Sequence, residues 1–299
     1  MTPAYDPVAE LLRGIRHSNA AVRIRASRAL ARLSAPSPDA FPILMKAVDD
    51  PERGVREASI QALGAYGQEV IPTLTQFLNH PDKYVRRNAV WAIGKYGPAA
   101  RFALSALCNA LCDADPRTAA GSAQALGSMG EVGGPAVPAL IDAMRGTNVV
   151  LCRLASKALS QIGSPALDPL MACLKHHDPF VRAEAALALG WMGPLAHEAV
   201  SELVQLVEAY RPRVPKRAAV LQFAGQSGLM TPPAPTTAIP QSSEETARLN
   251  GIQAFGRIGT GAGPALGLLR EIARCEEEPY RAAAELAIRQ IESPDGHSS

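Results

Sequence analysis

The sequence has few aromatic residues, no excess of charge of one sign and no long apolar run. Aromatic residues make up 5% of its 299 positions, whereas hydrophobic residues make up 47%. Its 30 basic and 28 acidic residues leave a formal net charge of +2, so the overall charge gives no reason to expect a polyanionic partner. No stretch approaches the roughly 18 apolar residues of a membrane-spanning helix, and we therefore expect no membrane association.

The cysteines give no sign of a disulfide framework or a metal site. They are five, an odd number, and form no Cys-x-x-Cys pair. This pattern favours reduced thiols, and no other motif in the sequence predicts a metal or a cofactor. The N-terminal residues MTPAYDPVAELL lack the basic segment and apolar core of a signal peptide, so the expected location is the cytoplasm.

One short segment recurs along the chain. Its clearest copies are VREASIQALGAYG (55–67), VRRNAVWAIGKYG (85–97), VRAEAALALGWMG (181–193) and ARLNGIQAFGRIG (247–259). We take the second residue of each copy as its reference. The reference positions lie 30 to 35 residues apart and are Arg23, Arg56, Arg86, Ala119, Cys152, Arg182, Arg217, Arg248 and Arg281. They predict nine structural units.

Each copy has the spacing of a helix. The residues at +3, +6, +7 and +10 from the reference are apolar or small, as in Ala89, Ala92, Ile93 and Tyr96. Such spacing is typical of one face of an α-helix. A glycine at +11, such as Gly97, predicts that the helix ends there, because glycine adopts the left-handed backbone conformation without a steric clash.

A second apolar run lies between successive copies, often with a proline near its start. Examples are FPILMKAV (41–48), IPTLTQFL (71–78) and VPALIDAM (137–144). Proline is tolerated in the first turn of a helix, where its missing N–H would have no partner. Each unit is therefore predicted to be two helices joined by a short turn, and stacked units would share one apolar core.

The unit P-x-L…D-P-x-V-R-x-x-A-x-x-A-L-G-x-x-G resembles the HEAT repeat, in particular the short bacterial type named after phycobilisome lyase subunits. The resemblance covers roughly residues 6–292. It implies an all-α fold, a right-handed α-solenoid (αα superhelix) of about nine helical hairpins. It also implies that the second helix of each unit lines the concave face.

The expected domain organisation follows from the repeat frame. Residues 1–292 are expected to form a single solenoid, and residues 293–299 a disordered tail. A Pro-rich insertion at 229–243 interrupts the pattern and is expected to replace one helix, because the frame resumes at Arg248.

The arginines of the VR pairs resemble the Asp–Arg ladder of this family. In such a ladder, an arginine at the start of one second helix bonds an aspartate in the turn of a neighbouring unit. The expected donors are Arg56, Arg86 and Arg182, and the expected acceptors are Asp50, Asp82, Asp115 and Asp178. Charge-assisted bonds of this kind would fix the angle between repeats. The alternative role for these arginines is ligand binding.

A track of basic and aromatic residues is predicted on the concave face of the N-terminal units. Its members are Arg25, Arg28, Arg87, Trp91, Lys95, Arg153 and Lys157. Basic residues interleaved with an exposed aromatic residue are suited to an acidic peptide, a phosphate-bearing ligand or nucleic acid. The alternative is that these long side chains only keep a helix face soluble.

No spacing of nucleophile, base and acid indicates catalysis. At the positions where the family's di-iron hydroxylases carry His–Glu ligand pairs, this sequence has other residues. We therefore predict a non-catalytic protein–protein interaction module, an adaptor or scaffold that binds an acidic or helical segment of another protein. One alternative is an enzyme subunit of the bilin lyase type. The other is a nucleic-acid-binding protein of the DNA glycosylase type, which the weak net charge disfavours.

Overall fold

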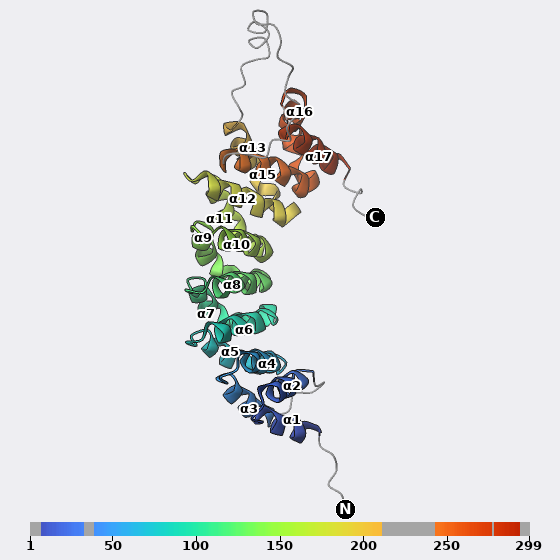
Figure 1. Ribbon diagram of the computed structural model, residues 1–299. Helices are drawn as coiled ribbons and strands as arrows, with labels where there is room; N and C mark the ends of the chain where they lie inside the picture. Colours follow the sequence, from blue (N-terminus) through green and yellow to red (C-terminus); the bar gives the residue numbers. More distant parts are fainter. Residues whose placement is uncertain (1–6, 33–38, 211–242, 277, 294–299) are drawn as a thin grey trace, which may run out of the picture. The chain divides into compact units, whose positions relative to one another are not determined.

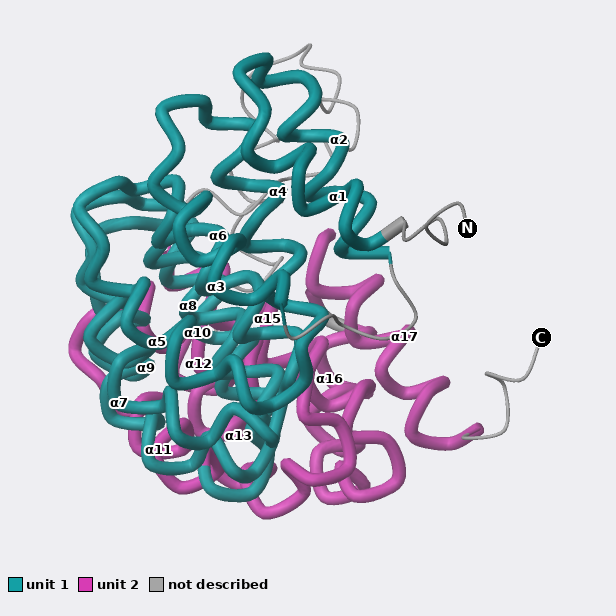
Figure 2. Tube along the Cα trace, turned by 90° about the horizontal axis from the view of Figure 1, so that it is seen from below, with its two compact units in different colours: residues 1–165 teal, residues 166–299 magenta. Residues whose placement is uncertain are grey.

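The computed structural model describes residues 7–32, 39–210, 243–276 and 278–293, and these residues form helices joined by short turns, without a β-strand (Figure 1). The chain divides into two compact units, residues 1–165 and 166–299 (Figure 2). Each unit is a stack of helical hairpins, as expected for an all-α solenoid. Among the described helices, none is both long and apolar enough to cross a bilayer.

Unit 1 contains five hairpins whose second helices lie side by side in chain order (Figure 1). The first helices are α1 (Pro7–Ile15), α3 (Ala40–Ala47), α5 (Ile71–Phe77), α7 (Leu104–Ala110) and α9 (Val137–Met144). The second helices are α2 (Ala20–Leu30), α4 (Arg53–Leu63), α6 (Lys83–Gly94), α8 (Pro116–Ser128) and α10 (Val149–Ile162).

Unit 2 contains three hairpins within its described residues. They pair α11 (Leu167–Cys173) with α12 (Pro179–Met192), α13 (Val200–Ala209) with α15 (Ser243–Ile258), and α16 (Leu266–Cys275) with α17 (Tyr280–Glu292). The second helices α12, α15 and α17 pack on one another in that order.

The position of α15 shows which second helices are neighbours in unit 2. The amide of Asn250 donates to the carbonyl of Ala183 at 2.9 Å, and a Cβ on Gly190 would lie 3.2 Å from Cα of Ala254. Thus α15 takes the place next to α12, and the described residues contain eight hairpins. The unit counted at Arg217 and residues 229–242 of the Pro-rich insertion lie outside the described residues, so their arrangement stays a prediction.

Short local signals begin and end the second helices. In five of them the side-chain oxygen of the N-cap residue accepts a hydrogen bond from a backbone N–H of the first turn, and these N-caps are Asn19, Asp82, Asp115, Asn148 and Asp178. Such caps satisfy N–H groups that have no partner within the helix. At the other end, the +11 glycines adopt positive φ as predicted, at Gly67, Gly97, Gly130, Gly163, Gly193 and Gly259.

Small residues let the second helices approach closely in both units. The stripe predicted from the sequence is buried, with Ala89, Ala92 and Ile93 fully inaccessible. Glycines at +8 face the next second helix, and a Cβ on Gly256 of α15 would lie 3.0 Å from Cα of Ala287 on α17. Tightly packed interfaces of this kind tolerate little added volume.

We predict that Gly256→Val lowers the free energy of unfolding by about 3 kcal/mol, because the added atoms overlap α17. Gly267→Val is the matched control. Gly267 lies in α16 of the same unit, and a Cβ at this position would have no atom within 4 Å. Urea denaturation followed by circular dichroism measures both. Equal stability of the two variants would contradict the close α15–α17 approach.

Candidate functional site

The second helices of unit 1 expose the same two positions of each repeat. Residues at +5 and +9 from the reference are four positions apart, about one helical turn, and the +9 residue lies in the last turn of the helix or just after its end. All of them are exposed: Arg28, Gln61, Trp91, Gln124 and Lys157 at +5, and Arg32, Ala65, Lys95, Ser128 and Gln161 at +9. We call this row of side chains the second-helix face.

Trp91 on α6 is the aromatic residue of this face. Its side chain is 48% exposed, and Nζ of Lys95 lies 3.7 Å from the centroid of its ring. A cation–π contact at an exposed site contributes about 0.5–1 kcal/mol. The contact therefore holds an ammonium group and an indole together one helical turn apart, with the indole still open to solvent.

Tyr84, at the start of α6, gathers three cations between α4 and α6. Cζ of Arg53 lies 4.0 Å from its ring centroid, Cζ of Arg87 5.1 Å, and Nζ of Lys83 5.5 Å. Arg53 also donates to Glu57 at 2.7 Å. The sequence analysis missed this cluster, because only the packing of α4 on α6 brings Arg53 to Tyr84.

The predicted basic track is spread along unit 1. Arg25 and Arg28 are exposed on α2, and Arg153 and Lys157 are exposed on α10. One second helix separates each pair from Trp91, namely α4 on one side and α8 on the other. The track is therefore a line of separate basic positions on alternate repeats, on α2, α6 and α10.

Arg87 is the exception within the track, since it is bound inside the molecule. Its Nε donates to Oδ2 of Asp115 at 2.6 Å, and its Nη2 contacts Oδ1 of the same carboxylate. Asp115 is the N-cap of α8 and also accepts from the N–H and hydroxyl of Thr118. Arg87 thus joins α6 to α8 and is not available as an unpaired cation on the surface.

The acids beside these arginines are held in their charged form. Hydrogen bonds from Arg87 are the main cause that lowers the pKa of Asp115 well below its usual range, although burial acts in the opposite direction. At Asp113, burial acts to raise the pKa, but bonds from Arg86 and from the N–H of Asp115 outweigh it and lower the pKa. Both carboxylates are therefore ionised at neutral pH.

Arginines and aspartates of adjacent hairpins form ion pairs in unit 1, which we call rungs. Nε and Nη2 of Arg23 donate to Asp50 at 2.8 and 2.9 Å, and Nε of Arg56 lies 3.0 Å from Asp82. Asp50 and Asp82 are acceptors that the sequence analysis named.

The third rung corrects one predicted acceptor. Arg86 donates to Asp113 at 2.7 and 2.8 Å, not to Asp115, which Arg87 occupies. The physical reason lies in the turn before α8. Both aspartates face α6 of the preceding hairpin, but Asp115, which also caps α8, pairs with Arg87, whereas Asp113, two residues earlier, pairs with Arg86. Sequence spacing alone does not distinguish two aspartates so close together.

Each rung arginine also closes the turn of its own hairpin. Nη1 of Arg56 donates to the carbonyls of Asp50 and Pro51 at 2.7 and 3.0 Å, and Nη1 of Arg86 makes the equivalent bonds to its own turn. In the degenerate fifth hairpin Cys152 replaces the arginine, and its Sγ donates to the carbonyl of Gly146 at 3.2 Å.

Arg182 and Asp178 of unit 2 depart from the predicted ladder. Nη1 of Arg182 bonds the turn carbonyls of His176 and His177, but no ion pair joins this arginine to an acid within the described part of the chain. Its guanidinium lies against Tyr210 instead, with Cζ 4.9 Å from the ring centroid. Asp178 caps α12 by accepting from the N–H of Phe180 at 2.8 Å.

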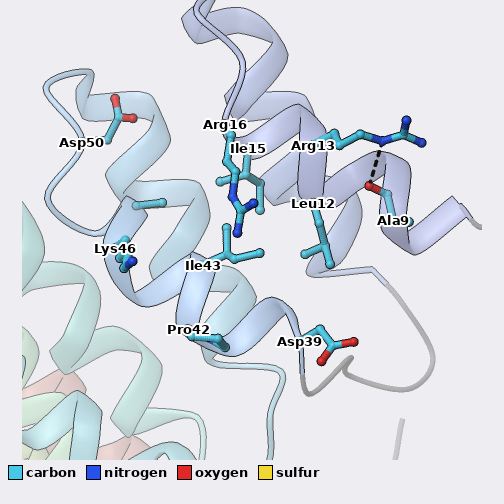
Figure 3. A pocket seen from close by; sticks show the side chains of 11 residues that line it. Ala9, Leu12, Arg13, Ile15, Arg16, Asp39, Pro42, Ile43, Lys46 and Asp50 are labelled. Atoms are coloured by element: carbon cyan, nitrogen blue, oxygen red, sulfur yellow. Dashed lines mark hydrogen bonds between the residues drawn. The ribbon is translucent and has the colours of Figure 1, made fainter.

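A cavity of about 710 Å³ lies between α1 and α3 at the start of unit 1. Leu12, Ile15 and Arg16 face Ile43 and Lys46 across it (Figure 3). Its volume falls within the range of small-ligand sites, and its lining combines apolar side chains with cations. The sequence analysis did not find this cavity, because it depends on how far apart two first helices pack.

Comparison with known proteins identifies the repeats. The family described as HEAT repeats matches residues 8–76, 71–151 and 137–224, which together run over more than half of the chain. No curated protein matches the chain.

Several solved structures are similar in fold. The YibA protein of Escherichia coli is 16% identical, with 95% of this chain and 92% of that chain covered and a TM-score of 0.51. The complex of CpcE and CpcF of phycocyanin lyase from Nostoc sp. PCC7120 is 16% identical, with 97% of each chain covered and a TM-score of 0.43. Human deoxyhypusine hydroxylase is 18% identical, with 95% and 96% covered and a TM-score of 0.35. At such identities the likeness concerns the fold alone.

The lowered pKa of Asp115 predicts a stability difference that depends on pH. At pH 7 we expect Asp115→Asn to be less stable by about 1–3 kcal/mol, because Arg87 loses a charged acceptor. The carboxylate contributes stability above its unfolded pKa of about 3.9 and loses it as the pH falls toward the lower folded pKa. The difference between wild type and variant should therefore shrink below about pH 4.

Urea denaturation at several pH values tests this expectation, with Asp142→Asn as control. Asp142 lies on α9 of the same unit, and its side chain is 79% exposed. The control should differ little from wild type at every pH. A constant deficit of Asp115→Asn from pH 7 to pH 3 would contradict the role of the carboxylate charge.

Proposed function

We propose that this chain, which belongs to the HEAT-repeat family, is a non-catalytic protein-binding module that holds an acidic segment of another protein on its second-helix face. Stacked helical repeats create extended surfaces on which successive units present equivalent positions. A partner that binds such a surface contacts several repeats at once, and its sequence is read by the side chains at these positions.

The charge of the second-helix face supports this proposal. Arg28, Arg32, Lys95 and Lys157 are the charged members of the face, and no acidic residue occurs at any of its ten positions. A face that serves only solubility has no need for one sign of charge, and the whole chain is close to neutral at +2. Local positive charge favours encounter with acidic segments and their correct placement.

Trp91 provides the apolar contact that charge alone does not supply. Aromatic residues at interfaces bury a large area and lose little side-chain freedom on binding. Lys95 already restrains the indole on one side, which lowers the cost of fixing it in a complex. An acidic segment with an apolar residue among its carboxylates would match this arrangement.

Nucleic acid is the competing partner, because cations beside an exposed indole also suit stacked bases and phosphates. The near-neutral net charge argues against it, since nucleic-acid-binding domains carry a strong basic excess. The two partners differ in a measurable way. Release of counterions from nucleic acid makes its affinity fall steeply with salt.

To test the proposal, a displayed peptide library should be selected on the full chain, and the dissociation constant of the best acidic binder measured by fluorescence anisotropy. We expect Trp91→Ala to weaken binding by about ten-fold or more. The double variant Lys95→Glu/Lys157→Glu should weaken it further, because it reverses two charges of the face.

Lys175→Glu is the matched control. Lys175 is exposed, belongs to unit 2 and is not a member of the second-helix face, so its reversal should leave the affinity unchanged. Three outcomes would overturn the proposal: equal loss in the control, no loss in the double variant, or selection of binders without acidic residues. Steeply salt-dependent binding of single-stranded DNA, lost in the double variant, would favour nucleic acid instead.

A further inference from the structure

In a complete rung, as formed by Arg23 and Arg86, all three nitrogens of the guanidinium donate hydrogen bonds. Nη1 of Arg23 donates to the carbonyls of His17 and Ser18, while Nε and Nη2 donate to Asp50 of the next hairpin. In unit 2, Arg248 is fully buried and donates to Glu276 at 2.7 and 2.6 Å. A carboxylate therefore binds an edge of the guanidinium in both units.

Arg182 has the first half of this geometry without the second. Its Nη1 donates to the carbonyls of His176 and His177 at 2.5 and 2.8 Å, as in a complete rung. The residue is only 8% exposed, yet its buried Nε has no hydrogen-bond partner within the described residues. A buried donor of a charged group that lacks a partner is costly, because it has lost its water and gained nothing in exchange.

The sequence explains why a neighbouring acid is missing here. In the rungs of unit 1 the acid comes from the turn of the next hairpin, and after α12 the corresponding connection runs from Tyr210 to Ser243. Residues 211–242 contain no Asp or Glu but carry Arg211, Arg213, Lys216 and Arg217. The stretch that would supply the acid therefore has none to supply.

Tyr210 contacts the guanidinium of Arg182 through its ring. Cζ of Arg182 lies 4.9 Å from the ring centroid. The N–H groups of a guanidinium point outward in its plane, and Nε with Nη2 matches the two oxygens of a carboxylate. Glu244 and Glu245, the first acids after residue 242, lie at the start of α15.

We propose that Arg182, backed by Tyr210, is a binding site for the carboxylate of an Asp or Glu side chain supplied by another protein. The incoming carboxylate would take the position that Asp50 occupies in a complete rung. The site belongs to unit 2 and shares no residue with the second-helix face, so it does not depend on the function proposed for unit 1. It would give a partner one deeply placed, charge-assisted contact at the edge of the repeats.

The test is a titration of the uniformly ¹⁵N-labelled full chain, followed through the arginine Nε–H resonances. The probe is the peptide Ac-Gly-Glu-Gly-NH₂, and Ac-Gly-Gln-Gly-NH₂ at equal ionic strength is its uncharged control. We expect the Arg182 Nε–H signal to shift and to saturate with the Glu peptide only. Arg23, which makes the same turn bonds but already holds Asp50, should not respond.

A second variant tests the same site without an added ligand. Tyr210→Asp places a carboxylate on the residue that contacts Arg182, so we expect a higher thermal midpoint and loss of the Arg182 response to the Glu peptide. The proposal is overturned if the Arg182 signal of the wild type does not move. It is also overturned if that signal moves without saturation, as expected for the exposed Arg28, or equally with both peptides.

Discussion

One guanidinium closes a turn and joins two hairpins in each complete rung of this protein. Arg86 shows the arrangement, because its Nη1 bonds carbonyls of its own turn and its other nitrogens bond Asp113 of the next hairpin. Turn closure and stacking thus depend on the same side chain. The register of the second helices follows from it, and with that register the +5 and +9 side chains of successive repeats come into line.

The repeat frame made the fold predictable from sequence. Apolar spacing and the +11 glycines located the second helices, because both reflect the local geometry of a helix and its end. The same frame did not predict the neighbour of α12. Residues 217–228 lie outside the described structure, so the repeat expected there stays a prediction, but the bond from Asn250 to Ala183 places α15 next to α12. Local spacing does not show which copies are neighbours in the stack.

The candidate site was predictable in position but not in detail. The exposure of Trp91, Arg28 and Lys157 follows from helical periodicity, which sequence reveals. The pairing of Arg87 with Asp115 does not, because it depends on the separation of α6 and α8 and on which aspartate caps the helix. Contacts between elements arise from packing, and a repeat pattern fixes only the side of the helix from which a residue can reach.

Within the described residues, no Arg–Asp rung joins the hairpin of α8 to that of α10. Ala119 stands at the arginine position of the fourth hairpin, and the fifth hairpin has Gly146 and Asn148 where other turns have acids. Small residues meet there, with a Cβ on Gly127 only 2.8 Å from Cα of Ala158. An interface that lacks an Arg–Asp rung has one directional restraint fewer than its neighbours, and directional bonds are what oppose sliding of packed helices. Bending of unit 1 under load should therefore concentrate at this joint, which would act as the compliant element between stiffer neighbours.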